Sequence, residues 1–287
     1  MCVPTTLNAN SVDRRRWREL GVAETLGVPA YAVGTAYLEM GATHSFTCAP
    51  YLLETAPKLG DQVAWGESNA VVFANSVLGA RTQKYADYLD ICAALVGRVP
   101  AAGPHLDEQR IATVVLDATH LATTLADELG DAFFPTLGYL CGNMAGAQVP
   151  VVVGLENHHV PITQDDLKAF SAAFGTSGAA ALYHMAGVTP EAPDAATALN
   201  GKAPAETIAL TAADLAVAWR SLDSGGQNNG GNDAVELVAV GNPHLSASEC
   251  ATLAALVSDG GAEKHQDVSM VATMGRQVMA EAEEAGQ

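Results

Sequence analysis

The stretch IATVVLDATHLATTLADELG, residues 111–130, decides the fold class that the sequence predicts. It begins with a continuous apolar run rich in β-branched residues, which is typical of a strand buried on both faces. The residues after this run, from 119 onward, have the apolar spacing of a helix. A strand followed directly by a helix is the repeating unit of parallel α/β sheets.

The same order recurs along the chain. Further strands are predicted at residues 149–156, 179–188, 234–242 and the first part of 267–286. Helices are predicted at residues 163–175, 246–260 and the second part of 267–286. Ser246 and Glu249 are spaced as a capping box for the second of these helices. This alternation predicts an α/β fold with mostly parallel sheets and helices on both faces.

The N-terminal third has weaker signals. Extended segments are predicted at residues 2–7, 44–53 and 61–65, and helices at residues 68–80 and 87–98. In the first of these helices we expect Ser68 to be the N-cap and Gly79 to be the stop. Much later in the chain, the Gly/Asn-rich segment near residues 223–233 is expected to be a flexible insert.

The net charge and the cysteine spacing limit the partners and the cellular setting that we expect for this protein. The chain has 14 Lys plus Arg against 32 Asp plus Glu, a formal net charge of -18, which disfavours nucleic acids and anionic membranes as partners. It contains no apolar run long enough for a membrane span and no secretory signal pattern. The 5 cysteines have no CxxC spacing, so we expect free thiols and a reducing, cytoplasmic setting.

Several polar groups follow predicted strands, where open parallel sheets bind ligands. Cys48 follows the strand-like residues HSFT, 44–47, and Glu67, Ser68 and Asn69 stand at the start of the helix over residues 68–80. Because a helix N-terminus has unpaired amides and partial positive charge, a carboxylate or phosphate could dock there. A purely structural role, in which Ser68 only caps and Asn75 only packs, is equally consistent with the sequence.

Some cysteines and histidines are each compatible with more than one role. Cys48 could be a metal or cluster ligand, a nucleophile, or a small buried apolar residue, which is the usual case for a lone cysteine. His158 and His159 are adjacent, so they favour a solvated loop over a shared metal. His184 lies within an apolar strand pattern and is most simply a hydrogen-bonded core histidine.

The block FTCAPYLLETAPKLGDQVAWGESNAVVFANSVLGART, residues 46–82, resembles the catalytic large-subunit region of the aconitase X family. The resemblance continues in order through residues 85–108, 137–143, 177–192 and 240–249. Within the family, GESNAVVFANS followed by KYADYLDICAALVGRVP is more similar to the cis-3-hydroxy-L-proline dehydratases than to the mevalonate 5-phosphate dehydratases. We therefore expect residues 1–287 to form a partial aconitase X-type catalytic region.

The resemblance implies an aconitase-like α/β architecture and a hydro-lyase for a small hydroxy acid. It implies an iron-sulfur cluster of unspecified type and a small swivelling domain, fused or separate, that closes over it. Iron with an open coordination position would act as a Lewis acid on the hydroxyl group. Cys48 matches a cluster-ligand position, and Arg81 is the best candidate for a carboxylate clamp. The expected substrate-binding positions are Glu67, Ser68, Asn69, Asn75, Ser76, Arg81, Thr82, His105 and His184. No residue is assigned as catalytic, because the family's acid/base serine lies on the swivelling domain.

Some features depart from the family pattern. Asn242 stands where some members have cysteine, and family members have segments before and after the region matched here. Cys48 alone cannot hold a conventional cluster, which needs about three or four thiolates. We therefore also expect that the chain could be a fragment, a split gene product or a non-catalytic remnant that keeps the fold.

Overall fold

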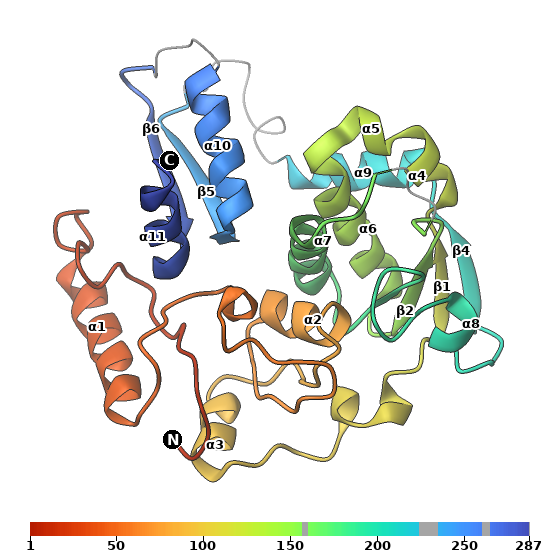
Figure 1. Cartoon of the computed structure of the whole chain (residues 1–287), viewed down its shortest axis with the longest axis horizontal. Helices are drawn as coiled ribbons and strands as arrows, with labels where there is room; N and C mark the ends of the chain where they lie inside the picture. The colour runs from red at the N-terminus through yellow and green to blue at the C-terminus, as the bar shows by residue number, and fades with distance from the viewer. Residues whose placement is uncertain (157–159, 224–234, 260–264, 287) are drawn as a thin grey trace.

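The computed structural model describes residues 1–156, 160–223, 235–259 and 265–286. A four-stranded parallel sheet has the order β3-β2-β1-β4, and a second parallel sheet pairs β5 with β6. The strands are β1 (Val114–Asp117), β2 (Pro150–Val153), β3 (His184–Met185), β4 (Glu206–Ala209), β5 (Leu237–Leu245) and β6 (Ser269–Met274). The predicted α/β class with parallel sheets is confirmed (Figure 1).

The helices surround and connect these sheets. They are α1 (Glu24–Glu39), α2 (Ser68–Ser76), α3 (Leu89–Val96), α4 (Thr119–Thr124), α5 (Ala126–Leu129), α6 (Phe133–Ala145), α7 (Gln164–Ser177), α8 (Ala195–Ala198), α9 (Ala212–Leu222), α10 (Ala247–Asp259) and α11 (Arg276–Glu284). Short 3-10 turns are η1 (Pro50–Leu52), η2 (Gly103–His105), η3 (Asp107–Gln109) and η4 (Gly130–Ala132). Figure 1 shows α7 lying between the two sheets.

Strand β1 explains how the four-stranded sheet is covered on both faces. Val114 and Leu116 point into the main core beside α6 and α7. Val115 points to the opposite face, into a smaller cluster that includes residues of α8. Because successive side chains of a strand alternate between faces, an uninterrupted apolar strand must be covered on both.

Helix α6 was not predicted from the sequence, and its glycines show why. Pro135, Gly138 and Gly142 lower its intrinsic helical propensity. In the structure a Cβ on Gly138 would lie 2.4 Å from the Phe170 carbonyl oxygen, and one on Gly142 would lie 2.1 Å from Ser177 Oγ. The glycines therefore let α6 approach α7 closely, and this packing outweighs local propensity.

Helix starts were predicted with mixed success. The capping box of α10 is confirmed, since Ser246 Oγ accepts from the Glu249 amide at 3.2 Å and the Glu249 carboxylate accepts from the Ser246 amide at 2.8 Å. The prediction of Ser68 as N-cap was wrong. Ser68 is the first helical residue of α2, and Glu67 is the N-cap without a side-chain capping bond. The helix ends at Ser76, before Gly79.

Three predicted extended segments form no regular strand. Residues 2–7 and 44–53 are irregular apart from η1, and residues 61–65 contribute only a bridge between Gln62 and Arg81. Pro4 and Pro50 lack the amide proton that a strand ladder requires. Strand β5 exists as predicted but is not buried, since Leu237 is 56% exposed.

Two expectations fall on parts of the chain outside the described residues. These are the flexible insert near residues 223–233, beyond Asp223, and the loop of His158 and His159. Within the described part, no helix combines the length and apolar character needed to cross a membrane.

Replacing Thr163 by alanine is expected to lower the free energy of unfolding by about 1 kcal/mol. The Thr163 hydroxyl accepts from the Asp166 amide at 3.1 Å and the Asp166 carboxylate accepts from the Thr163 amide at 2.8 Å, closing a capping box on α7. Chemical denaturation measures the loss. Thr163→Ser keeps the hydroxyl and should stay within a few tenths of a kcal/mol of wild type; equal losses in both variants would contradict the capping role.

Candidate functional site

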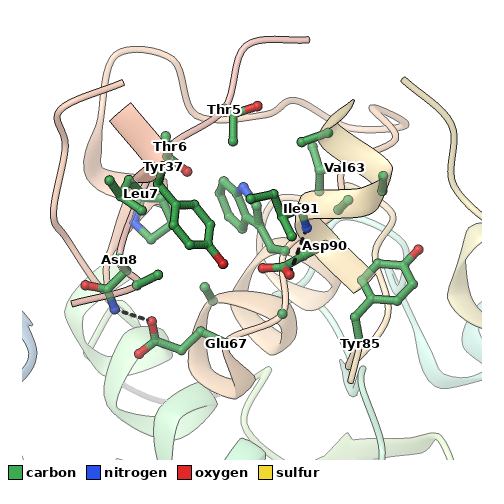
Figure 2. A pocket seen from close by; sticks show the side chains of 18 of the residues that line it. Thr5, Thr6, Leu7, Asn8, Tyr37, Val63, Glu67, Tyr85, Asp90 and Ile91 are labelled. Carbon is green, nitrogen blue, oxygen red and sulfur yellow. Dashed lines mark hydrogen bonds between the residues drawn. The ribbon is translucent and has the colours of Figure 1, made fainter. Parts of the chain in front are cut away.

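A pocket of about 990 Å³ lies among the N-terminal segment, α1, the start of α2 and α3. Figure 2 shows Thr5, Thr6 and Leu7 along one wall. Tyr37 from α1 and Asp90 from α3 point toward one another across the cavity. The start of α2 thus opens onto a cavity large enough for a small organic molecule.

Four polar side chains form a hydrogen-bonded chain that runs inward from this pocket. Asn8 Nδ2 donates to Glu67 Oε2 at 2.6 Å (Figure 2). Asn69 Nδ2 donates to Glu67 Oε1 at 2.8 Å, and the Tyr51 hydroxyl donates to Asn69 Oδ1 at 3.1 Å. The two carboxylate oxygens of Glu67 are therefore held from both sides, and their orientation is fixed.

The Glu67 carboxyl has a shifted protonation equilibrium. Although the residue is exposed to the pocket, desolvation by its neighbours raises the pKa of the carboxyl above its ordinary value. The hydrogen bonds from Asn8 and Asn69 act in the opposite direction, because they favour the charged form. A carboxyl with a raised pKa in a pocket is a candidate for proton transfer.

The turn that carries Cys48 lies against the start of α2. Tyr51, in this turn, donates from its hydroxyl to Asn69, and its ring stacks on Phe73 of α2 with centroids 4.1 Å apart. Glu67 is close enough to Cys48 to oppose ionisation of the thiol. The structure therefore brings together the two segments that the sequence analysis singled out, the Cys48 turn and the Ser68 helix start.

Cys48 itself is 8% exposed and is covered by residues from β5. The His244 amide donates to Cys48 Sγ at 3.1 Å, while His244 Nδ1 lies 3.0 Å from Thr47 Oγ1. Burial raises the pKa of the thiol, and the imidazole contacts Thr47 instead of the sulfur. This arrangement gives no support to a Cys–His nucleophile pair, which needs a lowered thiol pKa.

Three predicted substrate-binding residues are instead buried in backbone contacts. Asn75 Nδ2 donates to the carbonyls of Thr82 and Ala181, and Asn75 Oδ1 accepts from the Thr82 amide. The Thr82 hydroxyl bridges the backbone of Trp65 at 3.1 Å. Ser76 Oγ accepts from the Tyr183 amide at 2.9 Å. These bonds fix the backbone shape of the block over residues 46–82 and leave the three side chains away from the pocket.

Arg81 is also engaged by the chain's own side chains. It forms an ion pair with Asp107 and lies 4.0 Å from Glu191. A guanidinium already paired with two carboxylates is a poor clamp for a third. Within the described residues, the geometry therefore supports a structural role for Arg81 at the bridge to Gln62.

The two predicted histidines are buried and hydrogen-bonded. His184 Nε2 donates to the Arg110 carbonyl at 2.6 Å, and burial lowers the pKa of its ring. His105 Nδ1 donates to Gln62 Oε1 at 2.6 Å and Nε2 contacts the Tyr85 hydroxyl. Because burial also lowers the pKa of His105, it supports Tyr85 and Gln62 on the pocket wall as a neutral ring.

Known proteins match this chain over nearly its whole length. Sequence models of the aconitase X first, second and third domains match residues 1–108, 112–220 and 235–287, in that order. The chain belongs to the aconitase X family. The resemblance stated from the residues 46–82 block is thereby confirmed.

Among curated relatives, cis-3-hydroxy-L-proline dehydratase of Pseudomonas aeruginosa is 55% identical over 99% of this chain and 47% of its own length. Phosphomevalonate dehydratase large subunit of Methanothermobacter thermautotrophicus is 37% identical over 89% of this chain and 59% of its own length. The crystal structure of Thermococcus kodakaraensis aconitase X in its holo-form has a TM-score of 0.79 and 33% identity, covering 99% of this chain and 65% of that one. The chain spans about half the length of the cis-3-hydroxy-L-proline dehydratases it matches.

The aconitase X resemblance implied a cluster held by cysteines, and the described thiols do not fit one by themselves. Cys141 is fully buried in α6, and Cys250 Sγ lies 3.7 Å from Met274 Sδ. Cys2 and Cys92 are exposed and free. Among the described residues, no three His, Cys, Asp or Glu side chains are grouped as metal ligands would be. In the described part of the chain, Cys48 therefore belongs to no such group of ligands.

Two residues beside Cys48 and Glu67 were not singled out from the sequence. Asn8 lies in a segment without a clear pattern, and its bond to Glu67 spans 59 positions. Lys168 falls within the helical pattern of α7, where a lysine is usually solvent-exposed. Lys168 is only 3% exposed, and this burial in the core could be found only from the tertiary structure.

Proposed function

We propose that this chain forms part of the catalytic region of a dehydratase that removes water from cis-3-hydroxy-L-proline. The observation that carries the proposal is the 55% identity to a cis-3-hydroxy-L-proline dehydratase across 99% of the chain, which includes every element around the pocket. In this proposal the protein is a cytoplasmic hydro-lyase, Glu67 faces the substrate, and Asn69 supports Glu67 from behind.

The charges of the pocket favour this substrate over a phosphorylated one. Its acidic lining residues are Asp61, Glu67, Asp87 and Asp90, and its basic lining residue is Arg98. A hydroxyproline carries one secondary ammonium and one carboxylate, which match an acidic wall and one arginine. A phosphate group would need several donors or cations, so phosphomevalonate is the weaker candidate for this pocket.

Dehydration breaks a C–H bond and a neighbouring C–O bond and releases the two fragments as water. Glu67 could accept or return a proton within the pocket, because its raised pKa brings it closer to neutral pH. Asn8 and Asn69 orient the carboxylate toward the cavity. The enamine that dehydration produces tautomerises to a pyrroline-2-carboxylate, which gives the reaction a distinct product to detect.

Other features of the proposal depend on groups beyond these residues. Cys48 is the single thiolate that this chain would offer to an iron-sulfur cluster. The described residues do not complete the ligand set of a cluster, so its other ligands would have to come from another segment or subunit. The small swivelling domain, fused or separate, is the proposed partner that closes over the pocket.

The test is an anaerobic assay of the purified protein together with its swivelling domain, after supply of iron and sulfide. We expect consumption of cis-3-hydroxy-L-proline and formation of pyrroline-2-carboxylate. Lack of turnover in an intact, correctly paired complex would reject the dehydratase. It would favour instead a non-catalytic remnant that keeps the fold, and iron analysis of the same sample would show whether a cluster is present.

The Asn8→Ala variant should shift the pH dependence of this activity. Removing the Asn8 bond takes away support for the charged carboxylate, so the pKa of Glu67 should rise further. If Glu67 acts as the base, the acid limb of the kcat/KM profile then moves to higher pH, while activity well above that limb changes little. An acid limb that stays in place, or moves to lower pH, would exclude Glu67 as the group that limits the reaction in acid.

A further inference from the structure

Lys168 is a buried cation that the proposed reaction does not use. Its side chain, on α7, is 4% exposed. Nζ donates to the His244 carbonyl oxygen at 3.0 Å and pairs with the Glu249 carboxylate. Because a buried lysine is costly without such partners, these contacts must be what retains the charge in the interior.

Both partners of Lys168 lie in the segment matched by the aconitase X third domain. His244 is near the end of β5, and Glu249 is in the first turn of α10. The same Glu249 oxygen accepts from the Ser246 amide at 2.8 Å, so one carboxylate both caps α10 and binds Lys168. A second contact between α7 and α10 is the bond from Ser248 Oγ to Asp165 at 2.5 Å.

His244 extends this connection to the Cys48 turn. Its amide donates to Cys48 Sγ at 3.1 Å, and its ring lies 3.0 Å from Thr47 Oγ1. Thr47 Oγ1 already accepts from the Ala49 amide at 3.1 Å, so the hydroxyl proton is available to His244 Nδ1. His244 is thus bound to Lys168 through its carbonyl, and to the Cys48 turn through its amide and its ring.

We propose that Lys168 is a positioning residue that docks the third-domain segment onto the Cys48 turn through His244. The docked segment covers the thiol and directs an amide proton at its sulfur. Detaching it would leave Cys48 open to solvent. This proposal rests on the proposed function, because that function is what makes Cys48 important. The contacts themselves, and the experiment that tests them, do not depend on turnover.

A purely local role for Lys168 makes a different prediction. If the lysine only neutralised Glu249, its loss would weaken α10 and leave the thiol covered. Removing a positive charge near Cys48 would also reduce its thiolate fraction and slow its alkylation, since Lys168 favours the ionised thiol. Faster alkylation of Cys48 can therefore report only increased exposure.

The experiment measures alkylation of each cysteine by iodoacetamide at pH 8, in the reduced full chain with a chelator present, by mass spectrometry. Cys141, fully buried in α6, serves as an internal reporter of global unfolding. The variants are Lys168→Met and, as a second way to break the pair, Glu249→Gln. Lys84→Met is the matched control, because Lys84 Nζ also binds α7, through the carbonyls of Gly175 and Gly178 at 2.8 and 2.7 Å.

We expect Lys168→Met to raise the Cys48 rate at least tenfold and Glu249→Gln to raise it less, with Cys141 still protected. Lys84→Met should leave the Cys48 rate within about twofold of wild type. The proposal is overturned if Cys48 reacts at the wild-type rate or more slowly in Lys168→Met. It is equally overturned if Cys48 and Cys141 accelerate by the same factor in both Lys168→Met and Glu249→Gln.

Discussion

The Glu67→Gln variant is expected to lose a factor of roughly 10² to 10⁴ in kcat for the proposed dehydration of cis-3-hydroxy-L-proline, the range that one general acid or base contributes. Glutamine keeps the size of the side chain, and its Oε1 can still accept from Asn69. Its amide nitrogen can donate to Asn8 once the exposed Asn8 amide turns over to present Oδ1. It cannot carry a proton between substrate and solvent, so kcat should fall much more than KM changes. Steady-state kinetics on wild type and variant measure both.

The matched control for this loss is Asp87→Asn. Asp87 lines the same pocket, but it is exposed on the approach to α3. Its neutralisation should change kcat by less than about threefold and act on KM instead, because Asp87 belongs to the acidic wall that attracts the substrate ammonium. Equal losses in the two variants would mean that the pocket needs negative charge in general, and a fully active Glu67→Gln protein would remove Glu67 from the chemistry.

The second large effect is on stability. Arg110→Met should reduce the free energy of unfolding by about 3–5 kcal/mol, the range for breaking a buried, hydrogen-bonded ion pair. The Arg110 guanidinium pairs with Glu191 and donates to Asn75 Oδ1, the Asn75 carbonyl and the Pro104 carbonyl. Methionine would take one donor from each of these acceptors and leave the Glu191 carboxylate with Arg81, 4.0 Å away. Urea denaturation of both proteins measures the difference.

An exposed arginine provides the comparison. Arg15 is 65% exposed and lies 3.7 Å from Asp13, so Arg15→Met should cost less than about 1 kcal/mol. The double variant Arg110→Met with Glu191→Met should recover part of the loss, because it removes the carboxylate that has lost its closer cation. A loss near 1 kcal/mol for Arg110→Met would show that water replaces the missing contacts.

Local signals in the sequence were sufficient for the central elements of the fold. The apolar run of β1 and the capping residue Ser246 before α10 are both recognisable from a few neighbouring positions in the sequence. Helix α6 could not be predicted in this way, because its glycines are explained only by contact with α7. The exposure of strand β5 could not be predicted either, because composition does not reveal whether another layer covers an apolar strand.

The candidate site shows a similar division. The block over residues 46–82 predicted which segments lie at the candidate site. Glu67 lines the pocket, and Asn69 supports Glu67 through a hydrogen bond. The block did not distinguish these from Asn75, Ser76 and Thr82, whose partners are backbone groups that only folding brings near. Lys168 could not be found from its neighbours in sequence, because its partners are 76 and 81 positions away.

The most direct test of the central claim is the ratio of kcat/KM for cis-3-hydroxy-L-proline to that for mevalonate 5-phosphate, measured on one preparation of the protein with its swivelling domain. An acidic pocket with Arg98 as its basic lining residue predicts a ratio above about 100, since a missing set of phosphate donors costs several kcal/mol. A ratio near or below one, with the protein intact and the pocket residues in place, would contradict the account.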